Sequence, residues 1–458
     1  MKYVQGSRIV DAIYSVQKRT MYKGNPCIEA LPDSPGDEEL IESLYTEIPM
    51  DDLTSMSIYD RKDCIQSLAQ LFIPTGQMCD ISRKIMSSIK EGYVARNPLL
   101  ASFKKNLSAV QRAVINKDAS FSNISGINAN ACGFCLVGDS GMGKTSIVNH
   151  TLSLIPQVIE HTSYNGEDYV DTQLVWLKIE CPHDASIKGL CIDFFTELDR
   201  ALDDNTRQRF AGRATQDEMV SNMAFFAKKL NLGILVIDEI QNISAGKNGG
   251  AQRMKNLITQ MVNKIGIPIL LVGTPSAIAL LSTDLITIRR SCGQMGLSML
   301  YALEKNSLNW DLFTKKIWRY QWTINKAKRT PELTEKLYSY SRGNLDATIK
   351  LFMEAQRCAI DSGTEIITES IIERAANGPA FSYVFNKIRE EYDAMENMRK
   401  KAKKDYGIQT ALSMIDNDAV ALNDKSQDAR KSSKRKKEKK VMTYEEITKD
   451  IVKQDVKF

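Results

Sequence analysis

The chain has 458 residues, 43% of them hydrophobic and 26% charged, and a formal net charge of +5. This length accommodates two or three domains, and this composition is ordinary for a globular protein. No apolar run approaches the roughly 18 residues of a membrane span, the first residues lack a secretory signal, and the nine cysteines are scattered and odd in number. We therefore expect a reduced protein of the cytoplasm rather than a membrane protein or a disulfide framework.

The first part of the chain, residues 1–95, predicts a helical extension that we expect to bind a partner. Residues 53–72 and 78–93 have helical patterns with Ser or Asp near their starts. Residues 24–39 are dense in Pro, Gly and Asp, which is typical of a loop.

From about residue 130 onward, short apolar runs alternate with patterns of helical length. The runs are nearly unbroken and rich in β-branched residues, which predicts parallel strands with helices on both faces. Cys132 and Cys135 form a C-x-x-C pair, but no second pair or nearby His lies at zinc-site spacing, which favours core thiols over a metal or redox site. The expected strands are residues 131–137, 173–180, 232–238 and 266–273.

The sequence GDSGMGKT, Gly138–Thr145, matches the phosphate-binding pattern G-x-x-x-x-G-K-[ST] in full. Its glycines let successive backbone N–H groups curl around phosphates, Lys144 places a charge on the β- and γ-phosphates, and Thr145 offers a hydroxyl to Mg²⁺. The preceding apolar strand and the following helical pattern are the context that the motif requires. We therefore predict that ATP and Mg²⁺ bind here. The expected nucleotide-binding residues are Gly138, Asp139, Ser140, Gly141, Met142, Gly143, Lys144, Thr145, Ser146 and Asp238.

A later apolar run ends in Asp238 and Glu239, which places two carboxylates at the tip of a buried strand beside the phosphate loop. We expect Asp238, with Thr145, to hold Mg²⁺, and Glu239 to polarise a water for attack on the γ-phosphate. The next strand ends in Thr274, which either hydrogen-bonds the attacking water or the γ-phosphate, or caps a turn before Pro275. One strand, residues 173–180, is expected between the two motifs. Together these features indicate hydrolysis rather than the phosphate transfer of a small-molecule kinase.

Two arginines, Arg289 and Arg290, follow on an expected helix end or loop. In ring or filament ATPases an arginine in this position reaches the γ-phosphate of the neighbouring subunit and stabilises transition-state charge. The alternative is a surface pair, and position does not say which arginine acts. The expected catalytic residues are Lys144, Glu239, Thr274, Arg289 and Arg290.

After about residue 300 the strand patterns stop, and amphipathic helices predict a small helical lid over residues 301–385. Residues 386–458 have the pattern of a charged helix, a polar linker and a basic tail. The run Lys431–Lys440 in this tail holds seven basic residues and one acidic residue.

These motifs resemble the AAA+ superfamily, which implies an α/β P-loop ATPase core over residues 96–300. The segments GYVARNPLLASF (Gly92–Phe103), IECPHDASIKGLCIDFF and WRYQWT more particularly resemble the TnsC/TniB group. That group contains the AAA+ regulator subunits of multi-protein, TnsABC-type DNA transposons. The likeness covers roughly residues 90–380.

The resemblance implies an ATP-dependent homo-oligomer on double-stranded DNA in the bacterial cytoplasm, a ring or helical filament of roughly six to seven subunits per turn. Such an oligomer receives a target-selector protein and recruits the transposase, which stimulates ATP hydrolysis and so clears the oligomer. Related subunits contact an endonuclease through the C-terminal end, which is the basic tail here. One departure is that Asp346 stands where AAA+ lids often carry a nucleotide-contacting arginine, so that Arg342 is a possible replacement.

The chain has no helix-turn-helix or zinc-finger pattern, so DNA contact is expected to be largely independent of sequence. Lys188 lies at the start of an expected helix, and the candidates before the Asp238 strand are Arg207, Arg209 and Arg213. Each could instead be solvated surface charge. If each of six subunits held two phosphates, the log–log dependence of affinity on salt would have a slope on the order of −10.

Two other functions stay open. One is a nucleotide-gated DNA scaffold with little hydrolysis, and the other is a helicase loader or similar AAA+ protein of replication. The Glu239 carboxylate and the arginine pair favour hydrolysis over the scaffold.

Overall fold

The computed structural model describes residues 2–50, 52–115, 133–204, 215–245, 267–275, 295–379, 381–390 and 392. All of them belong to the first of two compact units, Met1–Tyr392 and Asp393–Phe458. Among these described residues, no helix combines the length and apolar character that crossing a bilayer needs.

A five-stranded sheet forms the centre of the first unit, and all of its strand pairs are parallel. The strands lie in the order β5-β6-β7-β2-β8, so the strand before the phosphate loop lies inside the sheet. This confirms the predicted α/β AAA fold, although the last strand, β8, is not among the expected strands. The strands are β2 (Phe134–Gly138), β5 (Trp176–Glu180), β6 (Ile234–Asp238), β7 (Ile269–Gly273) and β8 (Leu297–Leu300).

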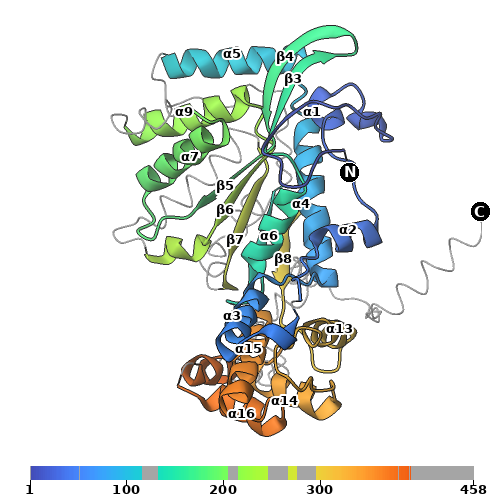
Figure 1. Ribbon diagram of the computed structural model, residues 1–458. Coiled ribbons are helices and arrows are strands. Elements are labelled where there is room, and N and C mark those ends of the chain that lie inside the picture. The colour runs from blue at the N-terminus through green and yellow to red at the C-terminus, as the bar shows by residue number, and fades with distance from the viewer. Residues whose placement is uncertain are drawn as a thin grey trace, which may run out of the picture. The chain divides into compact units, whose positions relative to one another are not determined.

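Helices cover both faces of this sheet (Figure 1). Every residue of β2, β6 and β7 is buried, and alternate side chains enter two different cores. On β6, Leu235 and Ile237 pack with α7 (Ile187–Ala201) and α9 (Gln216–Lys229). Val236 packs on the other side with α4 (Gly76–Val94) and α6 (Lys144–Ser153). The unbroken apolar runs of the sequence follow from this burial on both faces.

A second, three-stranded sheet has the order β1-β3-β4. It consists of β1 (Ile9–Asp11), β3 (Val158–Tyr164) and β4 (Glu167–Leu174), with β3 and β4 antiparallel. The expectation of one strand between the two nucleotide motifs is therefore wrong, because β3 and β4 precede β5 there. Asn165 and Gly166 form the hairpin turn with φ of 52° and 84°, and an Asn-Gly pair between strands is a hairpin signal.

The N-terminal region is helical, as predicted, and contacts both the sheet domain and the lid. Its helices are α1 (Pro26–Glu29), α2 (Asp37–Leu44), α3 (Ile58–Gln66) and α4. The next helix, α5 (Ala101–Ile115), lies beyond residue 95 and packs with α9. Whereas α4 packs in the core beside the sheet, α3 packs on the lid. Arg61 of α3 forms a buried 2.7 Å ion pair with Glu365 and donates to the Trp322 carbonyl over 3.0 Å.

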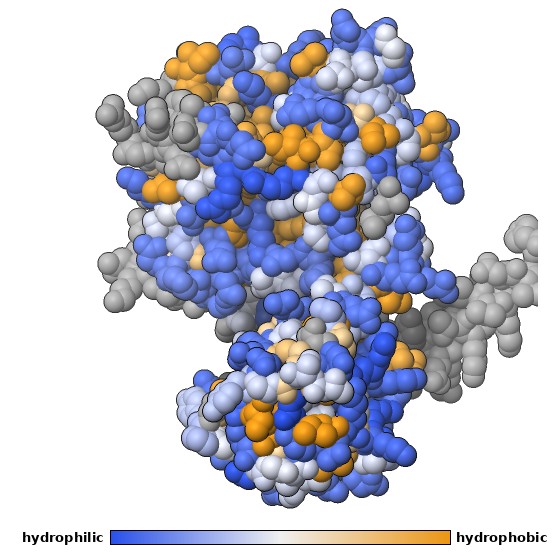
Figure 2. Space-filling view, viewed as in Figure 1, coloured by the Kyte–Doolittle hydropathy of each residue, from blue (hydrophilic) through white to orange (hydrophobic). Residues whose placement is uncertain are grey.

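The C-terminal part of the first unit is the helical lid that the sequence predicts. Its helices are α13 (Leu308–Ile317), α14 (Pro331–Ser341), α15 (Leu345–Asp361) and α16 (Glu369–Asn377). They enclose a core around Trp322 and Phe352, to which Ile65 and Leu68 of the N-terminal region also belong. On the face in Figure 2, polar residues predominate and apolar residues form small separate groups.

The segment GYVARNP connects α4 to the loop before β6. The Tyr93 hydroxyl donates to the Asn231 carbonyl over 2.7 Å, and the Arg96 guanidinium donates to the Leu232 carbonyl over 2.6 Å. Both side chains are buried. These residues therefore fix the N-terminal region on the sheet that carries the Asp238 strand.

Candidate nucleotide-binding site

The phosphate loop joins β2 to α6 with two glycines in left-handed backbone conformations. Gly141 has a φ of 80° and Gly143 a φ of 84°, which L-residues with side chains rarely adopt. Lys144 begins α6 and donates to the Asp139 carbonyl over 2.8 Å. Burial lowers the pKa of Lys144, while nearby carboxylates, Glu239 first, oppose that shift. The loop thus presents a helix N-terminus and an ammonium group to one space, as an anion site requires.

The predicted metal-binding residues lie together. The Thr145 hydroxyl donates to Asp238 Oδ2 over 3.0 Å, and the Glu239 backbone N–H donates to Asp238 Oδ1 over 2.9 Å. The Asp238 residue is 2% exposed. Hydroxyl and carboxylate oxygens are the donors that Mg²⁺ prefers, so this pair fits the expected ion. When bound, Mg²⁺ would neutralise charge on the β- and γ-phosphates.

Glu239 is held at the edge of the site by a residue that the sequence analysis missed. Its φ of 56° is unusual for a side chain of this size and turns the chain sharply after β6. The Gln241 side chain, in the 3₁₀ turn Ile240–Ala245, donates from Nε2 to Glu239 Oε2. Gln241 Oε1 in turn accepts from the Thr274 backbone N–H over 3.2 Å. Gln241 therefore links the expected catalytic carboxylate to the expected sensor at the end of β7.

The lid contacts the phosphate loop directly. Asn344 Nδ2 donates to the Ser140 carbonyl over 2.8 Å, and the Asp346 backbone N–H donates to the Gly141 carbonyl over 3.1 Å. The Asp346 carboxylate pairs with Lys350 over 2.7 Å. Asp346 lies beside the phosphate loop because it belongs to the first turn of α15.

Arg342 does not take over the role of the missing lid arginine in this conformation. It is not among the described residues that line the nucleotide cavity. Its guanidinium lies 5.4 Å from the ring centroid of Tyr392. A left-handed backbone at Arg342, with a φ of 51°, ends α14.

A cavity of about 400 Å³ lies between the phosphate loop, the N-terminal region and the lid. Ser140, Lys144, Thr145, Glu239 and Thr274 line its polar side. Its apolar lining comes from two regions outside the sheet domain, and apolar walls suit a nucleobase. The apolar residues are Ala69, Leu71, Phe72, Ile73 and Met78 before the core, and Phe313, Leu345 and Ile349 in the lid.

Phe72 of this wall packs against the helix that follows the phosphate loop. Its ring stacks on His150 of α6 with 3.9 Å between the centroids and an angle of 13° between the planes. This wall is not among the expected site residues, because in the sequence it appears as an apolar run before Pro74 in a segment expected to be an extension.

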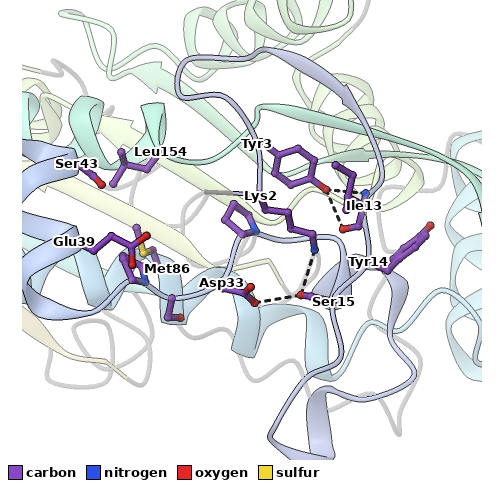
Figure 3. Close-up of a pocket in the computed structure, with 13 residues that line it drawn as sticks. Lys2, Tyr3, Ile13, Tyr14, Ser15, Asp33, Glu39, Ser43, Met86 and Leu154 are labelled. Atoms are coloured by element: carbon purple, nitrogen blue, oxygen red, sulfur yellow. Dashed lines mark hydrogen bonds between the residues drawn. The ribbon is translucent and has the colours of Figure 1, made fainter.

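A second cavity, of about 540 Å³, lies among the N-terminal loops (Figure 3). Lys2 lines it and donates to the Glu29 carbonyl over 2.6 Å and to the Ser15 hydroxyl over 3.3 Å. Burial lowers the pKa of Lys2 to about 8. The Ser15 hydroxyl donates to Asp33 over 3.2 Å. These polar groups form hydrogen bonds with one another and so hold the N-terminal loops together. The carboxylates of Asp33 and Glu39 would repel a phosphate, so this cavity does not suit a nucleotide.

Of the predicted DNA-binding residues, Lys188 lies in the described part of the chain. It is exposed on the first turn of α7. Ser186 already caps that helix by accepting from the Gly189 N–H over 3.1 Å, and the Asp184 carboxylate accepts from Ser186 N–H. The arginines Arg207, Arg209, Arg213, Arg289 and Arg290 lie outside the described residues.

Comparison with known proteins gives one family match, to a model described as an AAA domain, over residues 130–281. No curated protein matches. Among solved structures, the Walker-type ATPase PABY2304 of Pyrococcus abyssi is 11% identical with a TM-score of 0.38, over 66% of this chain and 76% of that one. The Aeropyrum pernix ORC1 protein, solved in complex with DNA, is 14% identical with a TM-score of 0.38, over 62% and 68%. The Thermotoga maritima RuvB branch migration motor is 16% identical with a TM-score of 0.30, over 60% and 67%.

The family match covers the phosphate loop, the Asp238 strand and the strand before Thr274. The site geometry agrees with it, because β2, β6 and β7 present these three elements at one edge of the sheet. The chain therefore contains an AAA-type P-loop domain over residues 130–281, and domains of this type generally bind ATP with Mg²⁺.

Proposed function

We propose that this protein is an ATP-dependent, DNA-binding AAA+ regulator of transposition. It oligomerises on target DNA and links a target-selector protein to the transposase, and ATP hydrolysis drives its disassembly. The basic tail contacts an endonuclease subunit. The protein works in the bacterial cytoplasm.

The observation that carries the hydrolytic part of this proposal is the linkage of Glu239 to Thr274 through Gln241. A carboxylate that only ended a strand would need no such support. Held beside Lys144 and Thr145 at the same cavity, Glu239 can accept a proton from a water that attacks the γ-phosphate.

The DNA-binding part of the proposal depends on positively charged side chains that each subunit of the oligomer repeats. Lys188 is one exposed cation per subunit, and Arg207, Arg209 and Arg213 add further cations. A single subunit then binds weakly, whereas an oligomer sums its phosphate contacts and loses affinity steeply with salt. In the oligomer, Arg289 or Arg290 completes the site of the next subunit.

The test compares the wild-type protein with Glu239→Gln, and Glu180→Gln is the matched control at the end of neighbouring strand β5. We expect Glu239→Gln to lower ATP turnover by about 100-fold or more while ATP-dependent coating of duplex DNA, followed by electron microscopy, persists. Glu180→Gln should keep wild-type turnover.

Four results would contradict the proposal. Isolated monomers on DNA in the presence of an ATP analogue would exclude assembly. Full-speed hydrolysis by a lone molecule without DNA would exclude a shared site. Equal, negligible turnover in wild-type protein and Glu239→Gln would favour the nucleotide-gated scaffold, and assembly that ignores added transposase would favour a replication role.

A further inference from the structure

The Asp238 carboxylate contacts a lysine that belongs to neither nucleotide motif. Lys178 Nζ lies 3.2 Å from Asp238 Oδ2 and donates to Asn149 Oδ1 over 2.9 Å. The same Asp238 oxygen accepts from the Thr145 hydroxyl over 3.0 Å. One carboxylate oxygen thus receives both an ammonium group and the hydroxyl expected on the metal.

The sheet places these groups together. Lys178 pairs with Val236 across β5 and β6, and Asp238 lies two residues further along β6. Residues two apart point to the same face of a strand, and helix α6, which supplies Asn149 and Thr145, covers this face. The pair is poorly hydrated, because the side chain of Asp238 is 3% exposed and that of Lys178 is 19% exposed.

We propose that Lys178 is a positioning residue whose ammonium group is shared by Asp238 and Asn149 until Mg²⁺ arrives with the nucleotide, and that it then leaves Asp238 and keeps its contact with Asn149. The inference rests on nucleotide binding at the phosphate loop and not on the DNA-binding part of the proposed function. A cation about 3 Å from a carboxylate in poorly hydrated surroundings opposes a second cation strongly. Mg²⁺ alone therefore binds weakly, and the phosphates of the nucleotide supply the additional charge that displaces the lysine.

The two contacts of Lys178 predict opposite effects for two substitutions. Lys178→Met removes the competing charge, so Mg²⁺ should bind more readily. Asn149→Ala removes the alternative acceptor and leaves the ammonium on Asp238, so Mg²⁺ should bind less readily. If Lys178 had only a structural role, the two substitutions would not change Mg²⁺ binding in opposite directions.

The experiment titrates Mg²⁺ against a fixed concentration of a fluorescent ATP analogue and reads equilibrium binding by anisotropy. In Lys178→Met the Mg²⁺ concentration at half saturation should fall by about tenfold or more, in Asn149→Ala it should rise, and Lys178→Arg should stay close to wild type. Lys336→Met, which removes the lysine of an exposed 3.0 Å pair with Glu373 in the lid, is the matched control and should not change it.

Unchanged or raised half-saturation in Lys178→Met would overturn the inference. If that variant does not fold, Lys178→Gln and Asn149→Ala carry the same test. If the wild-type protein binds no nucleotide at any Mg²⁺ concentration, the assignment of the nucleotide site fails, and this outcome is distinct from a Mg²⁺ midpoint that ignores Lys178.

Discussion

The side-chain amide of Asn344 in the lid donates a 2.8 Å hydrogen bond to the carbonyl oxygen of Ser140 in the phosphate loop. The oxygen of the same amide accepts from the Ala347 N–H over 3.0 Å and so caps α15. One side chain therefore both starts a lid helix and joins the lid to the loop. The lid position and the loop conformation are coupled through it.

We expect Asn344→Ala to lower the free energy of unfolding by about 1 kcal/mol through the lost cap and also to weaken ATP binding. Differential scanning fluorimetry and equilibrium binding measure the two effects. Thr368→Ala is the control, because Thr368 caps α16 by accepting from Ile371 N–H over 3.3 Å. Equal loss of nucleotide affinity in both variants would refute a special role for Asn344.

The second prediction concerns Gly141, which lies under the same contact. A Cβ there would approach Asn344 Oδ1 to 2.6 Å and Asp346 Cβ to 3.1 Å. Gly141→Ala should therefore displace the lid and weaken ATP binding by about tenfold or more, beyond the roughly 1 kcal/mol that a left-handed alanine costs.

Gly166→Ala separates these two effects. Gly166 has a φ of 84°, and no described atom lies within 4 Å of its added Cβ. It should lose stability and keep wild-type ATP binding, as measured by chemical denaturation and calorimetric titration. Normal ATP binding by Gly141→Ala would show that the lid adjusts freely.

The sequence predicts those features of the molecule that depend on residues close together in the chain. The phosphate loop and the strands before Asp238 and Thr274 follow from spacing and from burial on both faces, and the structure has them. The β3–β4 hairpin was missed because its strands are largely polar, with Glu160, Asp168 and Asp171 among their residues. Only its turn carried a signal.

The missed parts of the site come from distant segments. Phe72 lines the nucleotide cavity and stacks on His150 of α6, a contact that no local pattern encodes. Gln241 contacts Glu239 because the chain turns at a φ of 56°. The fold of a phosphate loop can therefore be predicted from the sequence, whereas the walls around it depend on tertiary packing.

The third prediction concerns Gln241. Gln241→Ala removes the link between Glu239 and Thr274 but leaves Lys144 and Thr145 in place. ATP affinity should stay within about twofold of wild type, while turnover falls by about tenfold, because a general base misplaced by about 1 Å loses much of its effect. A steady-state rate beside an equilibrium binding curve separates the two, and Asn242→Ala, at the residue that donates to the Cys181 carbonyl over 2.8 Å, is the neighbouring control. Loss of affinity without loss of turnover would contradict the positioning role.

The last prediction is a pH dependence of stability set by His161, a residue of β3 in the small sheet that is 1% exposed. Gln173 donates its amide N–H to the Cys27 carbonyl over 2.8 Å, so its oxygen faces His161 Nε2 at 3.0 Å. Nε2 therefore carries the proton, and Nδ1 accepts from the Tyr14 hydroxyl over 2.7 Å. This arrangement requires a neutral imidazole.

Burial lowers the pKa of His161 below its ordinary value of 6.5, although the Gln173 hydrogen bond and Asp171 oppose the shift. The unfolded chain therefore binds a proton more readily than the folded one just below pH 6.5. The contribution of neutral His161 to the free energy of unfolding is thus fully present above that pH. It is lost as the pH drops toward the pKa of His161 in the folded protein.

Urea unfolding at about pH 7.5 and about pH 5.5 measures this loss. His161→Gln, which cannot titrate, should show a smaller difference between the two pH values than the wild-type protein. His183→Gln, at an exposed residue outside the cluster, should keep the wild-type difference. The half-buried His150, whose pKa burial also lowers, contributes to the pH dependence that His161→Gln retains. His161 joins Tyr14, in the N-terminal region, to Gln173 on β4. If His161→Gln lost more free energy of unfolding between the two pH values than the wild-type protein, the cluster would tolerate an imidazolium. Its polar contacts would then not hold the hairpin to the N-terminal region.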